Sequence, residues 1–384
     1  MKRLGWILAA VCLLMGILPG KVQAVALEVP AKSAVLMDVE TGTLLYESNA
    51  HTPLAPASVT KVMTMLLIME AIDNGQISWN DTVTASENAA AKGGSQIYLK
   101  VGETMSVADM VKSIAVSSAN DCACAMAEHL AGSEEAFVEK MNARAKELGM
   151  ENTHFVNCTG LDDSEEAKAH HKTTAYDIAL MSRQLLKYHP DITKYTTIWM
   201  DTVRNGSFGL SNTNKLIRFY SGATGLKTGF TSDAGYCLSA SAKREGLELI
   251  AVVMGSTTSQ ERFSACKSLL DYGFANYALI SPEMGETAEV PVKLGRSDTV
   301  KAVPGSREAL LIDKSQRNTV TTHITLEETV AAPVSKGQRL GEMTVKSGEQ
   351  ILAQIPLVAE TAVERLSWGD IFLRILKKVT MAEA

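Results

Sequence analysis

The spacing of apolar and polar residues changes several times along this chain of 384 residues. SAVLMDVETGTLLYE, residues 33–47, predicts a β-hairpin that turns at residues 40–42, and GYCLSASA, KREG and LELIAVVMG together predict a second hairpin. Helical periodicity is found in four stretches: residues 57–73, 106–148 with breaks at SSAND and AGSEE, 173–188 capped by Thr173 or Thr174, and 259–277. Strands at both ends with helices between them predict one α+β domain over residues 27–277.

The pattern changes again after Pro282. Short β-rich segments alternate with turns rich in Gly, Pro and Ser, which predicts a small all-β domain over residues 284–358. The following segment, AVERLSWGDIFLRILKKV, returns to helical periodicity. Over residues 361–380 it has the wide apolar face, flanking Trp and basic patch of a helix that lies in a membrane interface, and too many charges to span a bilayer. A helix packed on the β domain or on a partner protein is the alternative.

The first 24 residues have the features of a secretory signal peptide. MKRLGWILAAVCLLMGILPGKVQA starts with basic residues, continues with an apolar run and ends in small residues before a cut after Ala24, or after Ala26. An uncleaved membrane anchor is the alternative. Cleavage removes three basic residues and no acidic ones, so the formal charge moves from −6 to −9. An acidic exported protein is a poor binder of nucleic acid.

The mature chain keeps five cysteines, an odd and sparse set that is not typical of a disulfide scaffold. Cys122 and Cys124 are two positions apart in a predicted helix, on nearly opposite faces, so we do not expect them to pair. Most of the cysteines are expected to be small buried hydrophobic residues. No cluster has the ligand spacing of a zinc site, and His170-His171 stands alone in a polar loop. The sequence therefore predicts neither a metal nor a cofactor.

Candidate chemistry begins in PLAPASVTKVMTML, where Ser58 and Lys61 are three positions apart at the start of a buried helix and so share a face. The positive end of the helix dipole and the apolar surroundings both disfavour a charged lysine. They favour a neutral amine that can activate the serine hydroxyl. A capping serine beside a lysine that extends its amine to solvent is the structural alternative. A second Ser-x-x-Lys, Ser264 to Lys267, lies well inside a helix without the proline-rich lead, and we interpret it as a decoy.

Two further motifs carry polar groups. In AVSSANDCACAMAEHLAG, Ser118 and Asn120 lie between two apolar helices, where they either cap the helices or point a hydroxyl and an amide into a cleft. In SGATGLKTGFTSDAGYCLSASA, Lys227 would bring positive charge and Thr228 a hydroxyl donor, while Gly229 would let a ligand lie close to the backbone. An ordinary strand edge is the alternative for this triplet.

The order Ser-x-x-Lys, Ser-x-Asn and Lys-Thr-Gly is that of the penicillin-interacting serine enzymes. With these motifs, and over nearly the whole chain, the sequence resembles the D-alanyl-D-alanine carboxypeptidases, the low-molecular-mass penicillin-binding proteins related to serine β-lactamases. NTHF at 152–155, NTNKL at 212–216, the trailing β domain and the amphipathic tail are part of this resemblance. It implies a β-lactamase/transpeptidase-like catalytic domain, with an antiparallel sheet and a cluster of helices.

The resemblance implies an enzyme that acts on peptidoglycan stem peptides ending in D-Ala-D-Ala. Ser58 would attack the carbonyl of the penultimate D-alanine, Lys61 would remove the serine proton, and Ser118 would help to pass it to the leaving nitrogen. Asn120 would hold the peptide amide and help to fix Lys61. Water would then release the acyl-enzyme, and β-lactams would be inhibitors.

Further residues bind the substrate by the same resemblance. Lys227 would keep the local potential positive, and Thr228 would bind the terminal carboxylate. Arg262 falls where the family places a carboxylate-binding arginine, with an exposed helical arginine as the alternative. The backbone N–H groups of Ser58 and Phe230 would form the oxyanion hole.

Two positions depart from the family pattern: Ala119, where relatives often carry Gly or Asp, and Phe230, where some carry His. The change at Phe230 can alter substrate preference or deacylation.

A class A β-lactamase would need a Glu-x-x-Leu-Asn motif, which is not found, and would lack the second domain and the tail. A cell-wall binding protein with a dead site is the rival from another class. Transpeptidase or endopeptidase activity stays open, because only the acceptor differs. The resemblance implies export to the outer face of the cytoplasmic membrane.

Overall fold

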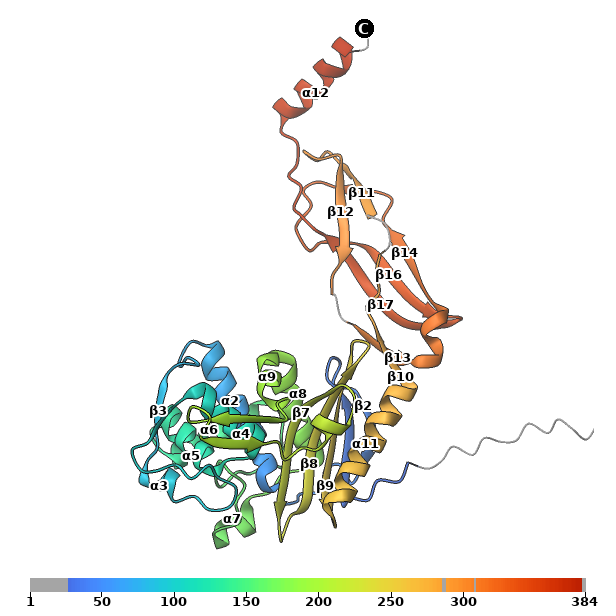
Figure 1. Ribbon diagram of the computed structural model, residues 1–384. Coiled ribbons are helices and arrows are strands. Elements are labelled where there is room, and N and C mark those ends of the chain that lie inside the picture. The colour runs from blue at the N-terminus through green and yellow to red at the C-terminus, as the bar shows by residue number, and fades with distance from the viewer. Residues whose placement is uncertain (1–26, 285–287, 307–308, 382–384) are drawn as a thin grey trace, which may run out of the picture.

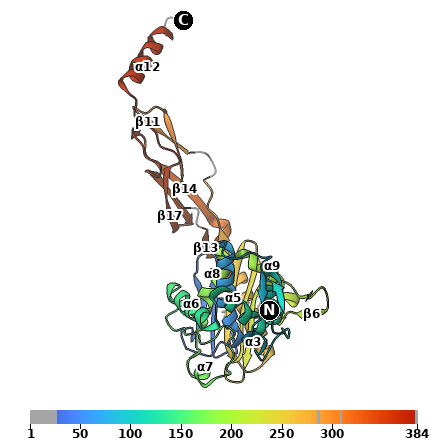
Figure 2. The same cartoon turned by 90° about the vertical axis from the view of Figure 1, so that its left-hand side faces the viewer.

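The computed structural model describes residues 27–284, 288–306 and 309–381. The predicted signal peptide, residues 1–24, lies outside the described residues. Figure 1 shows a mixed α and β domain at one end of the molecule, an elongated β domain beside it, and a helix beyond the β domain. Figure 2, turned by 90°, shows the same succession, so the N-terminal domain and the last helix lie at opposite ends.

A five-stranded antiparallel sheet forms the middle of the N-terminal domain, in the order β2-β1-β9-β8-β7. Its strands are β1 (Ser33–Asp38), β2 (Leu44–Ser48), β7 (Ala223–Thr231), β8 (Gly235–Arg244) and β9 (Leu247–Ser256). The two predicted hairpins are confirmed as β1–β2 and β8–β9. Strand β7, which the sequence suggested only as the alternative for the Lys-Thr-Gly triplet, pairs with β8 at the edge of the sheet and carries that triplet.

The alternation of side chains across this sheet creates two separate cores. Val35 and Val252 point into one core, whereas Leu36 and Leu249 point into the other. Helix α11 (Ser259–Asn276) covers the second core, and α8 (Ala175–Tyr188) covers the first (Figure 1). A sheet covered by helices on both faces confirms the predicted α+β class.

Helix α2 (Lys61–Asp73) runs through the helical cluster that packs on α8, which explains why it is apolar nearly all round. Val62, Met65 and Ile68 are fully buried in this cluster. One turn of 3₁₀ helix, η1 (Ala57–Thr60), precedes α2, so the predicted helix 57–73 begins in the tighter geometry. The other helices of the domain are α3 (Glu87–Ala90), α4 (Val107–Ser117), α5 (Asn120–Ala131), α6 (Glu134–Glu147), α7 (Glu165–His170), η2 (Pro190–Ile192), α9 (Thr193–Thr196) and α10 (Leu216–Phe219).

The predicted interruptions of the helical region occur where expected, between α4 and α5 and between α5 and α6. Of the two candidate caps of α8, Thr174 is the actual one, because its side chain accepts a hydrogen bond of 3.0 Å from the backbone N–H of Asp177. Two small hairpins complete the domain: β3 (Thr82–Thr84) with β4 (Thr104–Ser106), and β5 (Met200–Val203) with β6 (Phe208–Ser211).

The all-β character of the C-terminal domain is confirmed. Its main sheet has the order β14-β16-β17-β12-β11-β15 and encloses its own core, to which Val290, Leu340 and Leu357 contribute. The elements are β11 (Ala288–Lys293), β12 (Thr299–Pro304), η3 (Lys314–Thr319), β14 (Val320–Leu326), β15 (Val330–Ala331), β16 (Arg339–Ser347) and β17 (Gln350–Ala359). A separate pair, β10 (Tyr277–Ile280) with β13 (Leu310–Asp313), connects this domain to the end of α11.

The last helix is shorter than predicted. Helix α12 spans Trp368–Met381, whereas residues 361–367, which were predicted as its first turns, are not helical. Val363 forms a β-bridge with Val334 and is buried in the β domain, so this part of the apolar pattern serves that core. No helix among the described residues is long and apolar enough to cross a membrane.

Candidate active site

Ser58 and Lys61 meet at the junction of η1 and α2. The Lys61 Nζ lies 2.9 Å from the Ser58 Oγ and donates a second hydrogen bond of 2.7 Å to the backbone carbonyl of Thr159. Ala57, directly before the serine, has a φ of +49°, a conformation that residues other than glycine rarely adopt. Such strain occurs often at functional sites, where the surrounding structure enforces it.

Lys61 is completely buried, and burial lowers its pKa to about 7. The nearby acidic side chain of Asp121 acts in the opposite direction but does not outweigh the loss of solvent. Near neutral pH a substantial share of the Lys61 side chains is therefore uncharged. The prediction of a neutral amine beside the serine hydroxyl agrees with this environment.

Ser118 and Asn120 lie on either side of the break between α4 and α5. Ser118 ends α4 in the left-handed conformation, with a φ of +64°. The Asn120 Nδ2 donates to the carbonyl of Gly93 at 2.7 Å, and its backbone N–H donates to that of Ser95, also at 2.7 Å. The Asn120 Oδ1 is buried without a hydrogen-bond partner among the described residues. This orphaned acceptor is free for the predicted role of holding a peptide N–H. In the structure Asn120 bonds to the Gly93 and Ser95 carbonyls and not directly to Lys61.

The Lys-Thr-Gly triplet lies on the edge strand β7. Lys227 is completely buried, and its Nζ donates to the carbonyl of Thr228 at 2.8 Å. Burial, followed by the nearby charges of Lys61 and Arg262, holds the pKa of Lys227 well below its usual value. The Thr228 Oγ1 bonds to the Thr213 Oγ1 at 2.7 Å, which brings the NTNKL stretch to the site.

Gly229 lies directly against the turn that carries Ser58. A Cβ atom at this position would lie 2.7 Å from the Pro56 carbonyl oxygen and 3.1 Å from the Ser58 backbone nitrogen. The backbone of the nucleophile segment occupies the space that a side chain would need. The glycine therefore allows β7 and the Ser58 turn to approach each other.

Arg262 extends from α11 to the back of β7. Its Nη1 donates to the carbonyls of Gly229 at 2.9 Å and of Cys237 at 3.3 Å, and its guanidinium stacks against the Tyr236 ring. It is buried rather than exposed, which contradicts the alternative of an exposed helical arginine. The Phe230 side chain is 53% exposed and packs on Tyr236, with ring centroids 4.3 Å apart.

Sequence reasoning missed a hydrogen-bond chain that supports the nucleophile turn. The Val156 N–H donates to the His171 Nδ1 at 3.1 Å, so the ring proton lies on Nε2, which donates to the Thr60 Oγ1 at 2.8 Å. Thr60 in turn donates to the Ala57 carbonyl at 2.9 Å. Burial lowers the pKa of His171 to about 3, which keeps the ring neutral. The expectation that His170-His171 stands alone in a polar loop is therefore wrong for His171.

The other expectations about reactive residues can be compared with the structure directly. The five cysteines of the mature chain are all buried, as predicted for most of them, and all are free. No group of acidic, histidine or cysteine residues in the described part of the chain could hold a metal ion. In the decoy motif, Ser264 is exposed on the second turn of α11 and donates to the Glu261 carbonyl at 3.0 Å.

Comparison with known protein families identifies the family of serine enzymes to which this chain belongs. A family described as D-alanyl-D-alanine carboxypeptidase matches residues 20–258, and one described as penicillin-binding protein 5, C-terminal domain, matches residues 283–365. The chain belongs to the D-alanyl-D-alanine carboxypeptidase family. It is a serine-type carboxypeptidase, which confirms the predicted activity.

Individual relatives of this carboxypeptidase match over most of its length. D-alanyl-D-alanine carboxypeptidase DacF of Bacillus subtilis is 44% identical over 354 residues, which cover 91% of this chain and 88% of DacF. DacC of Escherichia coli is 33% identical over 366 residues, which cover 92% of this chain and 88% of DacC. The crystal structure of penicillin-binding protein 5 from Haemophilus influenzae superposes with a TM-score of 0.74 at 31% identity, covering 91% of this chain and all of that chain.

Proposed function

We propose that the carboxypeptidase removes the terminal D-alanine from peptidoglycan stem pentapeptides through an acyl-enzyme on Ser58, and that penicillin acylates the same hydroxyl. The 2.9 Å contact between the Lys61 Nζ and the Ser58 Oγ carries this proposal. Because the pKa of Lys61 is about 7, the amine can accept the serine proton near neutral pH. A structure of penicillin-binding protein D2 from Listeria monocytogenes in the ampicillin-bound form, 34% identical with a TM-score of 0.58, supports the β-lactam part.

In the proposed acylation, the Ser58 Oγ attacks the carbonyl carbon of the penultimate D-alanine while its proton moves to the Lys61 Nζ. The backbone N–H groups of Ser58 and Phe230 stabilise the negative oxygen of the tetrahedral intermediate. When the C–N bond breaks, Ser118 passes a proton to the nitrogen of the departing D-alanine. Water then attacks the ester, which restores the Ser58 hydroxyl and releases the shortened peptide.

The proposed substrate contacts start from one acceptor that the fold leaves without a partner among the described residues. The unpartnered Asn120 Oδ1 accepts the N–H of the peptide. The Thr228 hydroxyl and the positive charge of Arg262 attract the terminal carboxylate, and the bound carboxylate favours the charged form of Lys227, whose pKa is lowered by burial. Arg262 acts from behind β7, because its Nη1 is bound to the Gly229 carbonyl. Gly229 itself does not contact the peptide in this proposal but keeps Ser58 beside the strand.

Mass spectrometry of the purified protein, with a pentapeptide and separately with penicillin, tests the nucleophile. We expect one acyl group per chain, on the peptide that contains Ser58, and no labelling of Ser58→Ala. The pentapeptide should lose one alanine. A label on Ser264, or labelling that survives Ser58→Ala, would contradict the assignment. Rapid release of hydrolysed penicillin would indicate a β-lactamase instead, since a peptidase holds its acyl-enzyme for longer.

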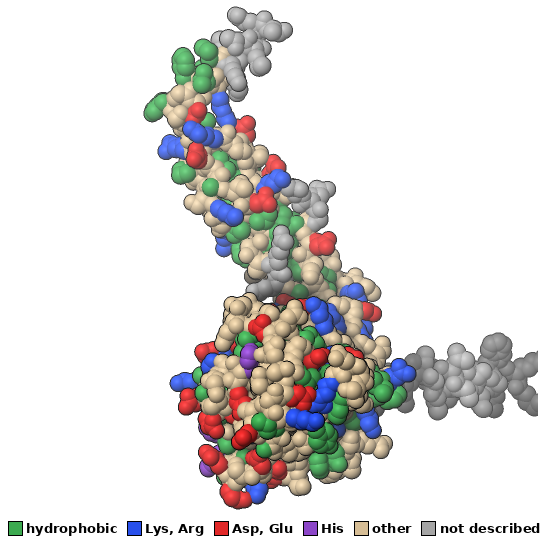
Figure 3. Space-filling view, turned by 60° about the vertical axis from the view of Figure 1, so that its left-hand side comes forward, with side chains coloured by type: hydrophobic (Ala, Val, Ile, Leu, Met, Phe, Trp, Pro, Cys, Tyr) green, Lys and Arg blue, Asp and Glu red, His purple; other side chains and the backbone are tan. Residues whose placement is uncertain are grey.

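We further propose that α12 attaches the exported enzyme to the outer face of the cytoplasmic membrane. The most exposed apolar side chains of this helix are Trp368, Phe372, Leu373, Ile375 and Leu376, at 50–88%. Figure 3 shows hydrophobic side chains gathered at this end of the molecule, beside charged ones. Such an exposed apolar face fits a helix that inserts into a lipid interface.

A further inference from the structure

The base Lys61 depends on a backbone turn that no sequence motif marks. The carbonyl of Thr159 accepts from the Lys61 Nζ at 2.7 Å, and the Asn157 side chain shapes the turn around it. The Asn157 Oδ1 accepts from the backbone N–H of Gly160 at 2.7 Å, and its Nδ2 donates to the Leu161 carbonyl at 2.8 Å. The position of the Lys61 amine is therefore set partly by the position of this turn, residues 157–161.

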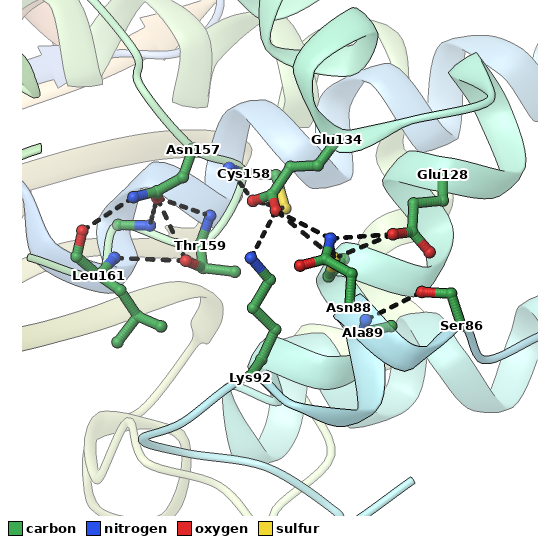
Figure 4. Close-up of polar contacts among 12 residues, drawn as sticks. Ser86, Asn88, Ala89, Lys92, Glu128, Glu134, Asn157, Cys158, Thr159 and Leu161 are labelled. Carbon is green, nitrogen blue, oxygen red and sulfur yellow. Dashed lines mark hydrogen bonds and ion pairs between the residues drawn. The ribbon is translucent and has the colours of Figure 1, made fainter. Parts of the chain in front are cut away.

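Glu134 holds the same turn from the opposite side. Its Oε1 accepts from both the backbone N–H and the Sγ of Cys158, each at 3.2 Å, as Figure 4 shows. Cys158 directly precedes Thr159, and its own carbonyl accepts from the Thr64 Oγ1 at 2.6 Å. Glu134 is the first residue of α6, where the helix dipole favours a carboxylate.

Lys92 completes this arrangement from a third segment. Its Nζ lies 2.5 Å from the Glu134 Oε2, and the two side chains are only 16% and 9% exposed. The next residue, Gly93, gives the carbonyl that fixes the Asn120 amide, and Ser95 gives the carbonyl that accepts the Asn120 backbone N–H. Lys92 thus belongs to the segment that orients Asn120, while Glu134 holds the turn that orients Lys61. Figure 4 shows Glu134 between Lys92 and Cys158.

We propose that the Lys92–Glu134 ion pair is a positioning unit for acylation, because it ties the segment that orients Asn120 to the turn that orients Lys61. This inference rests on the proposed roles of Ser58 and Lys61. Neither Lys92 nor Glu134 contacts the reacting atoms. Burial raises the pKa of the Glu134 carboxyl, but the hydrogen bond and charge of Lys92 outweigh it and leave the pKa below its usual value. The carboxylate is therefore charged at every pH at which Lys61 can act as a base.

Glu134→Gln should keep the shape of the side chain but remove the charge that attracts Lys92. The glutamine amide has only one acceptor oxygen, so it can accept a hydrogen bond from the Lys92 ammonium or from the Cys158 N–H but not from both. One of the two contacts is therefore lost. We expect the acylation rate constant with penicillin to fall about 10–100-fold, since small misplacements of catalytic groups have effects of this size. A weaker contact of the Thr159 carbonyl with the Lys61 ammonium also moves the acidic limb of the rate profile to lower pH.

The matched control is Glu70→Gln. Glu70 forms an ion pair of 2.8 Å with Arg144, with side chains 19% and 22% exposed, and it lies on the same helix as Lys61 but toward its other end. This substitution changes the charge in the same way without touching the turn 157–161. Lys92→Met and Lys92→Arg form a second pair, in which arginine keeps the charge and methionine keeps only the apolar stem.

The experiment measures the penicillin acylation rate from pH 5 to 9 and the melting temperature for all five proteins, wild type included. The proposal predicts a slower rate and a shifted acidic limb for Glu134→Gln and Lys92→Met, with Glu70→Gln like wild type and Lys92→Arg close to it. If Glu134→Gln does not fold, Lys92→Met decides. Rates and profiles that stay at wild-type values while only the melting temperature falls would overturn the proposal. Acylation of Ser58 in the wild-type protein is measured separately. If wild-type Ser58 is not acylated, the proposed function fails, whatever the variants show.

Discussion

At the scale of single residues, the site is built from two lysines that are buried without an ion-pair partner in the described part of the chain. Lys61 bonds to Ser58 and the Thr159 carbonyl, and Lys227 bonds to the Thr228 carbonyl. Burying a basic group in this way disfavours its charged form and costs folding free energy. Burial of Lys61 therefore lowers the stability of the fold at the position where the proposed mechanism uses a neutral amine.

Lys61→Met should therefore stabilise the fold while it abolishes acylation. The pKa of Lys61 is about 7 in the folded protein against a reference of 10.5, so the unfolded chain binds more protons between these values and wild-type stability rises with pH. At about 1.4 kcal/mol per pKa unit, relief of this penalty is worth at most about 5 kcal/mol, less the lost hydrogen bonds. The gain should be full below pH 7 and fade toward pH 10.5.

Denaturant unfolding of both proteins at several pH values measures this effect, with penicillin labelling to confirm the loss of acylation. If the unfolding free energy of Lys61→Met at pH 6 is equal to or lower than that of the wild type, the buried lysine does not destabilise the fold. Lys112→Met is a suitable control, because Lys112 forms ion pairs with Asp109 and Asp201, both at 3.2 Å, and its pKa is raised rather than lowered.

Gly229→Ala tests the close packing of this glycine against the Ser58 turn. The added methyl would meet the Pro56 carbonyl at 2.7 Å, and a backbone atom cannot move aside without displacing the Ser58 turn. We expect a loss of acylation of at least about 10-fold, with a destabilisation of about 1–3 kcal/mol from overpacking. Gly209→Ala, where a Cβ would meet nothing within 4 Å, is the control. Unchanged acylation kinetics in Gly229→Ala would contradict the close approach of β7 and the turn.

Much of this site could be predicted from the sequence, and the missing part has a physical reason. In the proposed mechanism, Ser58, Lys61 and Asn120 act through side chains whose type and order are visible in the sequence. The Thr159 carbonyl acts through the backbone, which any residue could supply, so its identity carries no signal. His171 is more than 100 positions from its partner Thr60, and no local periodicity connects them. Contacts of these two kinds appear only once the fold brings the segments together.

At the scale of elements, α12 shows how one apolar pattern can serve two purposes. Residues 361–367 belong to the β domain, and the helix begins only where Ser367 and Asp370 bond to each other, with the Asp370 N–H donating to the Ser367 Oγ at 3.2 Å. On its polar face, Arg374 reaches Asp298 of the β domain at 2.9 Å. The helical periodicity of the sequence continues through residues 361–380. It could therefore not show that residues 361–367 belong to the β domain and that only the following residues form α12.

A chain that ends at Leu366 tests the proposed membrane attachment. It keeps Val363, which completes the core of the β domain, and removes the exposed apolar side chains of α12. We expect normal hydrolysis of a soluble D-Ala-D-Ala peptide and loss of sedimentation with anionic vesicles. As a matched control in the full chain, Phe372→Asp should weaken vesicle binding, whereas Thr361→Asp should not. Sedimentation of the shortened chain, or none of the full chain, would rule out this attachment.

At the scale of the whole molecule, the two domains meet through a small joint. The pair β10–β13 continues from the end of α11, the Lys314 Nζ donates to the Phe274 carbonyl at 3.0 Å, and Arg317 bonds to Glu245 at 3.0 Å. These contacts tie the β domain to the end of α11 and to the turn between β8 and β9. The joint therefore limits how far the catalytic domain can turn relative to the β domain.

The placement of the β domain between the catalytic domain and α12 has a consequence for how the enzyme meets its substrate (Figures 1 and 2). An enzyme attached through α12 would work within a layer of fixed height above the lipid surface, and wall strands outside that layer would escape it however abundant they were. Its rate in the cell would then follow the local density of pentapeptides in that layer rather than their total amount. A longer or shorter β domain would move the layer outward or inward, and so select newer or older wall without any change in the catalytic residues.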